Sequence, residues 1–286
     1  PQVLTEKFAT AIGKHPLKRE IIATHITNTV LNRTGATFIN FIAAESGAPT
    51  ADVIRAFTLA REVFDLEPLW DQLDALDYKV DSRLQLDLLA KLIAIAQRAS
   101  RWMLRIRAQG TDMPTLIQRY QPAAREMRAN LTSWLPVSAQ TSWQQATDAL
   151  VQAGVDATLA QSLTALEFIF PALDLVDLAQ TANTALEHAA RTYFEIDAEL
   201  GLTQWRAQIN RLPTDTLWQT QARGSARDDV YSIARQITLG QLTRGSADGS
   251  SWHTLHSQSI ARLQRLLTTI STQAADLAPV SVALRE

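Results

Sequence analysis

Apolar residues recur three and four positions apart over most of the chain, which is the spacing of one face of an α-helix. The clearest stripe lies in the stretch 83–109 and comprises Leu88, Leu92, Ile95, Ala99, Trp102 and Ile106. Alternation of apolar and polar residues every two positions, which is typical of a half-buried strand, is not sustained anywhere. The pattern predicts an all-α protein, folded as a multi-helix bundle.

Breaks in this pattern predict where the helices begin and end. A long first helix is expected to begin at Pro16 and to end before the turn 46–49, and Thr50 is expected to cap the next helix. Ser82 and Gln85 predict a capping box for the helix 83–109. The remaining helices are expected near 68–76, 113–131 with an interruption at Pro122, 142–153, 156–169, 172–183, 185–200, after Gly201, from a cap at Thr214 to 242, and 252–277.

Residues 1–286 are expected to form one domain, with an internal joint between two packed subbundles. The joint is expected at 132–141, where Trp134 and Pro136 interrupt the helical pattern. Residues 245–251 are Gly- and Ser-rich and predict an exposed loop.

The first helix has two unlike faces. One is apolar, formed by Ile22, Ile26 and Val30 and widened by Leu17, Ile21 and Leu31. The other is a ridge of His25, Asn28 and Asn32. Because these polar residues are poor helix formers, their presence favours a close contact with hydrogen bonds across it. An interfacial role is favoured over proton transfer for the histidine and over small-molecule binding for the asparagines.

Composition narrows the function classes. The chain has 286 residues, 46% of them hydrophobic and 20% charged, which is typical of a globular protein. Its net charge of −2 argues against a non-specific nucleic-acid binder, and the absence of cysteine excludes disulfides and thiolate chemistry. No apolar run reaches the roughly 18 residues that span a membrane and no signal peptide opens the chain, so we expect no membrane partner and a cytoplasmic location. The chain begins at Pro1 without a methionine, so we expect it to be a piece of a longer polypeptide.

A basic edge follows the 83–109 helix, formed by Arg98, Arg101 and Arg105. Like charges four positions apart repel each other, so these arginines are expected to have partners outside their own helix. One interpretation is a site for an anionic effector or an acidic partner. The favoured one is pairing with carboxylates of a neighbouring helix, for which Asp228 and Asp229 are candidates.

Arg227, Asp228 and Asp229 are expected to form structural ion pairs. Asp228 and Asp229 point about 100° apart on a helix, so they cannot act as an acid–base pair on one atom. His253 and His256 have the spacing of two metal ligands, but a solvated first turn is the favoured interpretation, and no metal is expected.

Several motifs, in order along nearly the whole chain, resemble those of one family. They are His15–Phe41, Arg61–Leu66 with Leu69 and Trp70, Arg101–Arg105, Trp218 followed by Arg227–Asp229, and Ser281–Glu286. Together they closely resemble the C-terminal helical region of the large bacterial NAD-specific glutamate dehydrogenases. The resemblance implies that a catalytic domain lies upstream, and that the intact enzyme oxidises L-glutamate to 2-oxoglutarate and ammonium with NAD in glutamate catabolism.

No segment matches the family's catalytic lysine and aspartate motifs, and the glycines do not form a dinucleotide-binding turn. We therefore expect this fragment to be inactive alone, with no catalytic, cofactor-binding or metal residues. The resemblance favours a non-catalytic domain that contacts the upstream catalytic domain or another subunit of a homo-oligomer. Two alternatives stay open: a regulatory module whose arginine edge binds an effector, and a stand-alone helical adaptor.

Overall fold

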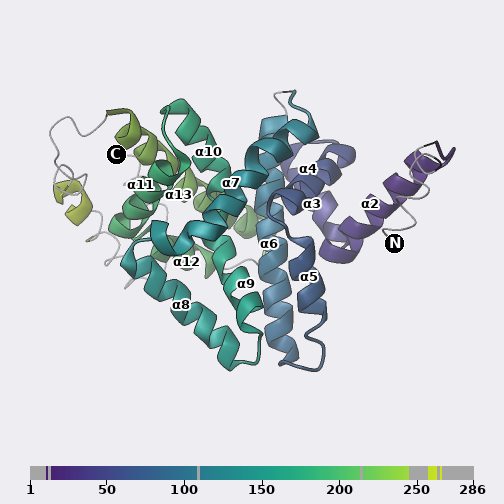
Figure 1. Ribbon diagram of the computed structural model, residues 1–286, viewed down its shortest axis with the longest axis horizontal. Helices are drawn as coiled ribbons and strands as arrows, with labels where there is room; N and C mark the ends of the chain where they lie inside the picture. The colour runs from purple at the N-terminus through teal and green to yellow at the C-terminus, as the bar shows by residue number, and fades with distance from the viewer. Residues whose placement is uncertain are drawn as a thin grey trace. The chain divides into compact units, whose positions relative to one another are not determined.

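The computed structural model describes residues 11, 14–107, 110–212, 215–244, 257–262 and 265 (Figure 1). Every regular element within these residues is an α-helix, which confirms the predicted all-α, multi-helix fold. The expected cap Thr214, the expected loop 245–251, and most of the expected final helix with His253 and His256 lie outside the described residues.

The chain divides into two compact units. Unit 1 comprises residues 1–122 and 148–170, and unit 2 comprises residues 123–147 and 171–286. Two helices, α7 (Met113–Trp134) and α8 (Val137–Gln152), contribute residues to both units. The expected joint at 132–141 lies inside unit 2, so the division falls at other positions in the chain.

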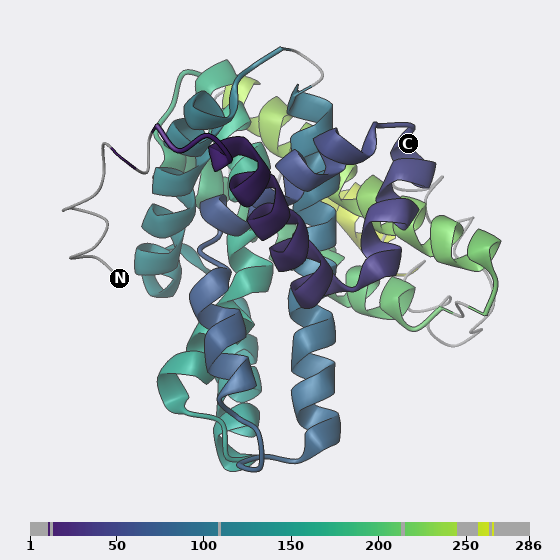
Figure 2. The same ribbon diagram turned by 90° about the vertical axis from the view of Figure 1, so that its right-hand side faces the viewer.

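Unit 1 is built around the long helix α6 (Ser82–Arg107), whose most extensive partner is α4 (Thr50–Val63). Figure 2 shows the short helix α5 (Glu67–Asp74) running beside α6. The other complete helices of this unit are α2 (Lys18–Thr34), α3 (Ala36–Ser46) and α9 (Ala157–Ile169).

The predicted apolar stripe of α6 lies in the core of unit 1. Its residues are buried except for Ile106, which is half-buried. Trp102 packs edge-on against Tyr120, with ring centroids 5.0 Å apart. A second group of aromatic rings links three helices. The centroid of the Phe57 ring of α4 lies 5.6 Å from that of Phe38 and 5.9 Å from that of Trp70. Aromatic pairs of this kind add about 0.5–1.5 kcal/mol to the burial of their apolar area.

The expected continuous first helix is wrong, because it ends at Gly35 and restarts as α3. Gly35 has φ +79°, a conformation that glycine adopts readily and other residues rarely do. Its N–H still donates to Leu31 O, which closes the last turn of α2. The break changes the direction of the chain and leaves α2 as a separate helix.

The expected caps of α4 and α6 are also wrong. The cap position of α4 is Pro49, with no side-chain hydrogen bond, and Thr50 is its first helical residue. At α6 the cap is Asp81, whose Oδ1 accepts hydrogen bonds from the backbone N–H groups of Arg83 and Leu84 at 3.0 and 3.2 Å. Ser82 is the first helical residue and does not occupy the cap position, so it does not form a capping box with Gln85, whose side-chain N–H groups donate to Leu73 O and Asp77 Oδ1. A carboxylate one position earlier satisfies the free N–H groups better than a hydroxyl, because it also carries a charge that suits the positive end of the helix.

The expected interruption at Pro122 is wrong as well, since α7 runs through it without a break. Proline inside a helix removes one hydrogen bond to the fourth residue before it. Tyr120, Ala124 and Met127, on either side of it, are almost completely buried. We attribute the continuity of the helix to this packing, which outweighs the lost bond.

Unit 2 contains α10 (Ala172–Thr181), α11 (Leu186–Leu200), α12 (Leu202–Asn210) and α13 (Leu217–Arg244). The long helix α13 packs against the other three. Its start is a capping box that the sequence reading missed. Thr216 Oγ1 accepts from the Gln219 N–H at 3.2 Å, and Gln219 Oε1 accepts from the Thr216 N–H at 2.9 Å.

Candidate interaction surface

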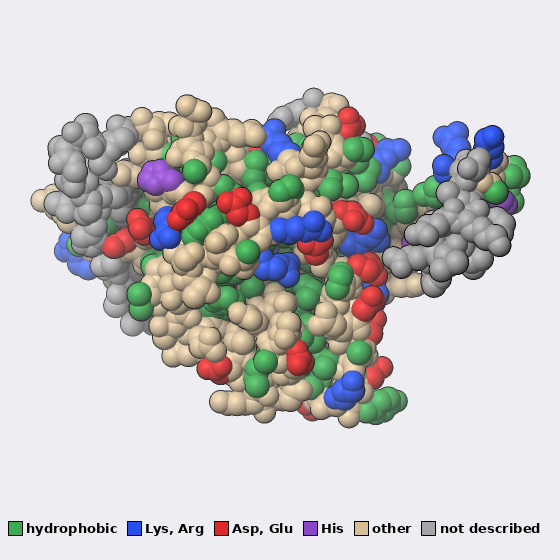
Figure 3. Space-filling model, in the orientation of Figure 1, with side chains coloured by type: hydrophobic (Ala, Val, Ile, Leu, Met, Phe, Trp, Pro, Cys, Tyr) green, Lys and Arg blue, Asp and Glu red, His purple; other side chains and the backbone are tan. Residues whose placement is uncertain are grey.

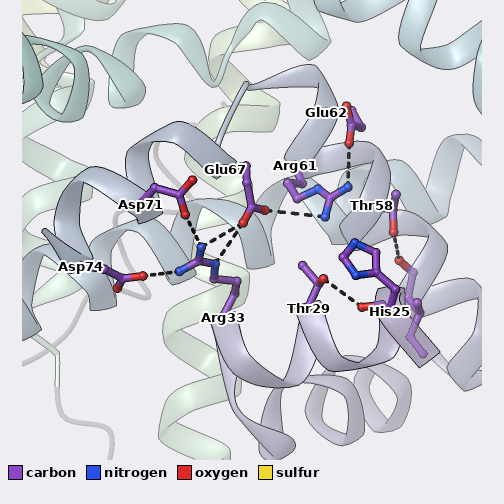
Figure 4. Close-up of polar contacts among 10 residues, drawn as sticks. His25, Thr29, Arg33, Thr58, Arg61, Glu62, Glu67, Asp71 and Asp74 are labelled. Atoms are coloured by element: carbon purple, nitrogen blue, oxygen red, sulfur yellow. Dashed lines mark hydrogen bonds and ion pairs between the residues drawn. The ribbon is translucent and has the colours of Figure 1, made fainter. Parts of the chain in front are cut away.

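The C-terminal end of α2 is fixed to α5 by one arginine that meets three carboxylates (Figure 4). Arg33 Nη2 lies 2.9 Å from Glu67 Oε1 and 2.5 Å from Asp71 Oδ1. Its Nη1 lies 2.5 Å from Asp74 Oδ2. The three acidic residues are four and three positions apart, so they share one face of α5 and a single guanidinium reaches all of them.

The environment of Arg33 keeps it charged. Its side chain is only 18% exposed, and its guanidinium also lies over the Trp70 ring, 5.9 Å from the centroid. Burial lowers the pKa of Arg33, but hydrogen bonds and charges from Asp74 and Glu67 outweigh burial and raise this pKa above its ordinary value. Arg33 is therefore positively charged in this contact with α5.

Glu67 extends this attachment to α4. Its Oε2 lies 3.6 Å from Arg61 Nη1, and Arg61 Nη2 lies 2.7 Å from Glu62 Oε1. The four carboxylates of this group outnumber the two guanidinium groups, and Figure 3 shows acidic side chains along the edge that α5 occupies. The group thus joins α2, α4 and α5 and leaves an acidic edge.

The rest of α2 is largely uncovered. Figure 1 shows its N-terminal half projecting from the other helices of unit 1. Within α2, Val30 is fully buried and Ile26 is half-buried. The large apolar side chains that stay exposed on this helix and its cap are Leu17 at 56%, Ile21 at 55%, Ile22 at 46% and Leu31 at 38%.

The expected two-faced arrangement of α2 is therefore partly wrong. Leu17, Ile21 and Leu31 do not widen the buried side, because at 100° per residue they lie about 100° to 180° around the helix from Val30, the residue of α2 that enters the core. They lie on the same side of the helix as the exposed residues His25, Asn28 and Asn32. We call this side the outer face of α2, defined by Leu17, Ile21, Thr24, His25, Asn28, Leu31 and Asn32. That His25, Asn28 and Asn32 make contacts across an interface stays a prediction.

The arginine edge of α6 is largely occupied by unit 1 itself. Arg101 Nε lies 2.7 Å from Glu45 Oε2, and its guanidinium lies over the Phe41 ring at 5.6 Å. Arg98 stacks on the Phe170 ring at 4.6 Å, and Arg105 is exposed. The expectation of an acidic partner on a neighbouring helix is thus met for Arg101 by Glu45 of α3.

In unit 2, Arg227 and Asp229 are half-buried on α13, and Asp228 is exposed. That these three residues form structural ion pairs stays a prediction. Another arginine of the same helix, Arg235, has its Nε 3.6 Å from Asp174 Oδ1 of α10.

A more buried ion pair in unit 2 was not predicted. Arg206 Nη2 lies 2.6 Å from Asp197 Oδ1, with side chains 16% and 11% exposed. Thr203 Oγ1 donates to Asp197 Oδ2 at 2.7 Å, and the guanidinium lies 5.0 Å from the centre of the Tyr231 ring. Burial lowers the pKa of Arg206, but the Asp197 charge raises it far above the ordinary value. Burial also raises the pKa of the neighbouring Tyr193.

These ion pairs hold helices of each unit together. Among the residues that the structure describes, there is no group of three or more His, Asp or Glu side chains placed to hold a metal ion. Within the same part of the chain no single helix is long and apolar enough to cross a membrane; α9 and α10 meet those criteria only when counted together as a bent pair.

The Arg33 group was missed from the sequence because its members are 34 to 41 positions apart. One signal was available. Glu67, Asp71 and Asp74 recur on one helical face without a basic residue on that helix, which indicates that they have a partner elsewhere.

The whole chain matches one known family. The sequence model described as "Glutamate dehydrogenase, C-terminal" matches residues 1–286. The chain is 30% identical, over its full length, to the NAD-specific glutamate dehydrogenases of Halomonas elongata and Pseudomonas aeruginosa, and 28% identical to that of Mycobacterium tuberculosis. In each case the match covers 18% of the relative, so the chain spans less than one fifth of the length of these proteins.

Proposed function

The chain belongs to the family of glutamate dehydrogenase C-terminal domains, and from that premise we propose that it is the non-catalytic helical domain of an NAD-dependent glutamate dehydrogenase. The intact protein would oxidise L-glutamate to 2-oxoglutarate and ammonium, with NAD as the hydride acceptor. The match over all 286 residues, to relatives that carry this name, is the observation on which the proposal depends.

We place the reaction on a catalytic domain in the remaining part of the polypeptide. The relatives are more than five times as long as the stretch they share with this chain, which leaves room for such a domain. We also propose a cytoplasmic location, where NAD and glutamate are both available, and a homo-oligomeric assembly.

The role of these 286 residues would be mechanical. Ion pairs such as Arg101–Glu45 and Arg206–Asp197 are used to hold the helices of each unit together. The outer face of α2 is left uncovered, and it would dock on the catalytic domain or on another subunit. Docking would limit how the catalytic cleft opens or would help to assemble the oligomer.

The pairing of Arg101 with Glu45 favours this role over an effector site on the arginine edge. An anionic effector at this edge would have to displace Glu45 from a side chain that is only 17% exposed. Exchanging one partner of a charged pair for another yields little net free energy.

Three preparations test the proposal: the full-length protein, the same protein without residues 1–286, and this chain alone. Formation of NADH from NAD and glutamate is measured for each. We expect activity from the full-length protein, altered activity or assembly after the deletion, and no activity from the isolated chain. A full-length protein that is inactive with glutamate, or an isolated chain that turns it over, would overturn the proposal.

A further inference from the structure

The exposed outer face of α2 carries residues at the spacing of a helix-packing surface. Leu17, Ile21, Thr24, Asn28 and Leu31 are spaced four, three, four and three positions apart. This is the spacing of the seam along which two helices pack in a coiled coil. We call these five residues the α2 seam.

The seam faces away from the core of its own unit. At 100° per residue its centre lies about 140° around the helix from the direction of Val30, the buried residue of α2. Leu17 and Ile21 are more than half exposed, at 56% and 55%, and Leu31 is 38% exposed. Burying such side chains contributes about 1.5–3 kcal/mol each when it is complete, so a free apolar seam is costly.

The helix that carries the seam is held at one end only. Arg33 binds three carboxylates of α5, and Val30 enters the core, both near the C-terminal end of α2. The N-terminal half has no side-chain cap. The attachment therefore fixes one end of α2, and within the described part of unit 1 the seam residues are exposed.

The polar seam positions narrow the kind of partner. An asparagine in a seam costs stability and fixes register when a matching polar group lies opposite it. Thr24 and Asn28 occupy two of the five seam positions, and contacts between domains of one chain are more polar than obligate interfaces between chains. The seam thus suits a helix with a mixed apolar and polar stripe.

The size of the seam indicates where that helix comes from. From Leu17 to Leu31 the seam is about 21 Å long, and a helix is about 10 Å wide, so it offers only a few hundred Å². Association of separate chains needs about 800 Å² on each partner. A partner on the same polypeptide needs less, because its effective concentration is already about millimolar.

We propose that the α2 seam binds an amphipathic helix from the part of the same polypeptide that lies outside these 286 residues. This deepens the proposed function and rests on it, because the relatives have more than four fifths of their length outside the shared stretch. The seam sets the register of the docked helix, with Asn28 meeting a polar group and Ile21 and Leu31 meeting apolar ones.

A photo-crosslinking residue in place of Ile21 in the full-length protein tests the proposal. The same residue in place of Leu86, which is 64% exposed on α6, is the matched control. Isotope-labelled and unlabelled copies are mixed before irradiation, so that mass spectrometry separates links within one polypeptide from links between two. We expect links from position 21 to a helix of the same polypeptide outside these 286 residues, at least about tenfold more abundant than from position 86. Links between two copies, links only to residues within 1–286, or equal yields at both positions would overturn the proposal.

Amide exchange of the full-length Ile21→Glu protein is a second readout. We expect roughly tenfold faster exchange in α2 than in the Leu86→Glu control, and exchange equal to the control counts against docking. An assay of the unmodified full-length protein with NAD and glutamate distinguishes a failure of the seam inference from a failure of the proposed function. An active protein without the link rejects the seam inference alone, and an inactive protein that forms the link rejects the proposed function.

Discussion

Helices α6 and α2 carry similar apolar patterns and have opposite environments. The α6 stripe is buried except for its last residue, Ile106, which is half-buried. Of the apolar residues of α2, only Val30 is buried. An apolar pattern along a helix therefore indicates a packing surface without saying whether the partner lies in the same unit.

The N-terminal ends of α6 and α2 also differ in how they are capped. Asp81 caps α6 with two hydrogen bonds, whereas α2 has no side-chain cap at its start. A helix that depends on neither a cap nor a buried stripe has to be stabilised by contacts at its other end, and Arg33 supplies them. The contrast shows that α6 is held by the core of unit 1 and that most of α2 is exposed.

The largest expected effect is in α6. Leu92→Ala should lower the free energy of unfolding of this chain by about 2–5 kcal/mol, because it removes a side chain that is 1% exposed and leaves a cavity. Urea denaturation followed by circular dichroism measures the change. A loss below about 1 kcal/mol would contradict the central place of α6 in the core.

Removing the attachment of α2 should have a smaller effect. Arg33→Gln leaves carboxylates of α5 without their cation and should cost about 1–2 kcal/mol, and the loss should shrink at high salt. Arg55→Gln is the control, since Arg55 pairs with Asp52 in an exposed ion pair that contributes about 0–0.5 kcal/mol. If both variants lost the same free energy of unfolding, the Arg33 group would contribute no more than an exposed surface ion pair.

The cap of α6 is expected to contribute about 1 kcal/mol. Asp81→Ala removes the acceptor for two backbone N–H groups, and Ser82→Ala is the control because its hydroxyl is not the cap. Thermal unfolding of both variants measures the difference. If Ser82→Ala destabilised the chain more than Asp81→Ala did, the capping box predicted from the sequence would be reinstated.

The smallest effect is expected on the seam. Ile21→Ser should change the stability of the isolated chain by less than about 0.5 kcal/mol, because the side chain is already 55% exposed. The same substitution in the full-length protein should reduce the protection of α2 against amide exchange. Strong destabilisation of the isolated chain would place Ile21 in the core and remove the contrast with α6.

Residue patterns were enough for the fold class and for most helices. The stripe of α6, the end of α9 at Ile169 and the end of α11 at Leu200 follow from spacing and from the breaks that come after them. Pro122 misled the prediction, because burial of its neighbours in α7 outweighs a local rule. Gly35 also misled the prediction, because a single glycine is tolerated inside a helix and only the backbone φ reveals the break.

The candidate surface was only half predictable. Spacing alone placed His25, Asn28 and Asn32 on one ridge of a helix, and all three are exposed. Helical spacing also places Leu17, Ile21 and Leu31 on the side of His25, Asn28 and Asn32, and assigning them to the apolar side was an error of the prediction. Spacing could not show which side of α2 is exposed, because that depends on contacts with distant residues such as the pairing of Arg33 with α5. The recurrence of Glu67, Asp71 and Asp74 on one face of α5 indicates a basic partner, but spacing cannot identify Arg33, which is more than 30 positions away, as that partner.

Hydrogen–deuterium exchange of α2 and α6, compared between this chain alone and the full-length protein, tests the central claim most directly. The claim is that these helices form a scaffold whose open face is completed by the rest of the polypeptide. We expect α6 to exchange at the same rate in both proteins, and α2 to exchange roughly tenfold more slowly in the full-length protein. Equal exchange of α2 in the two proteins would contradict the account.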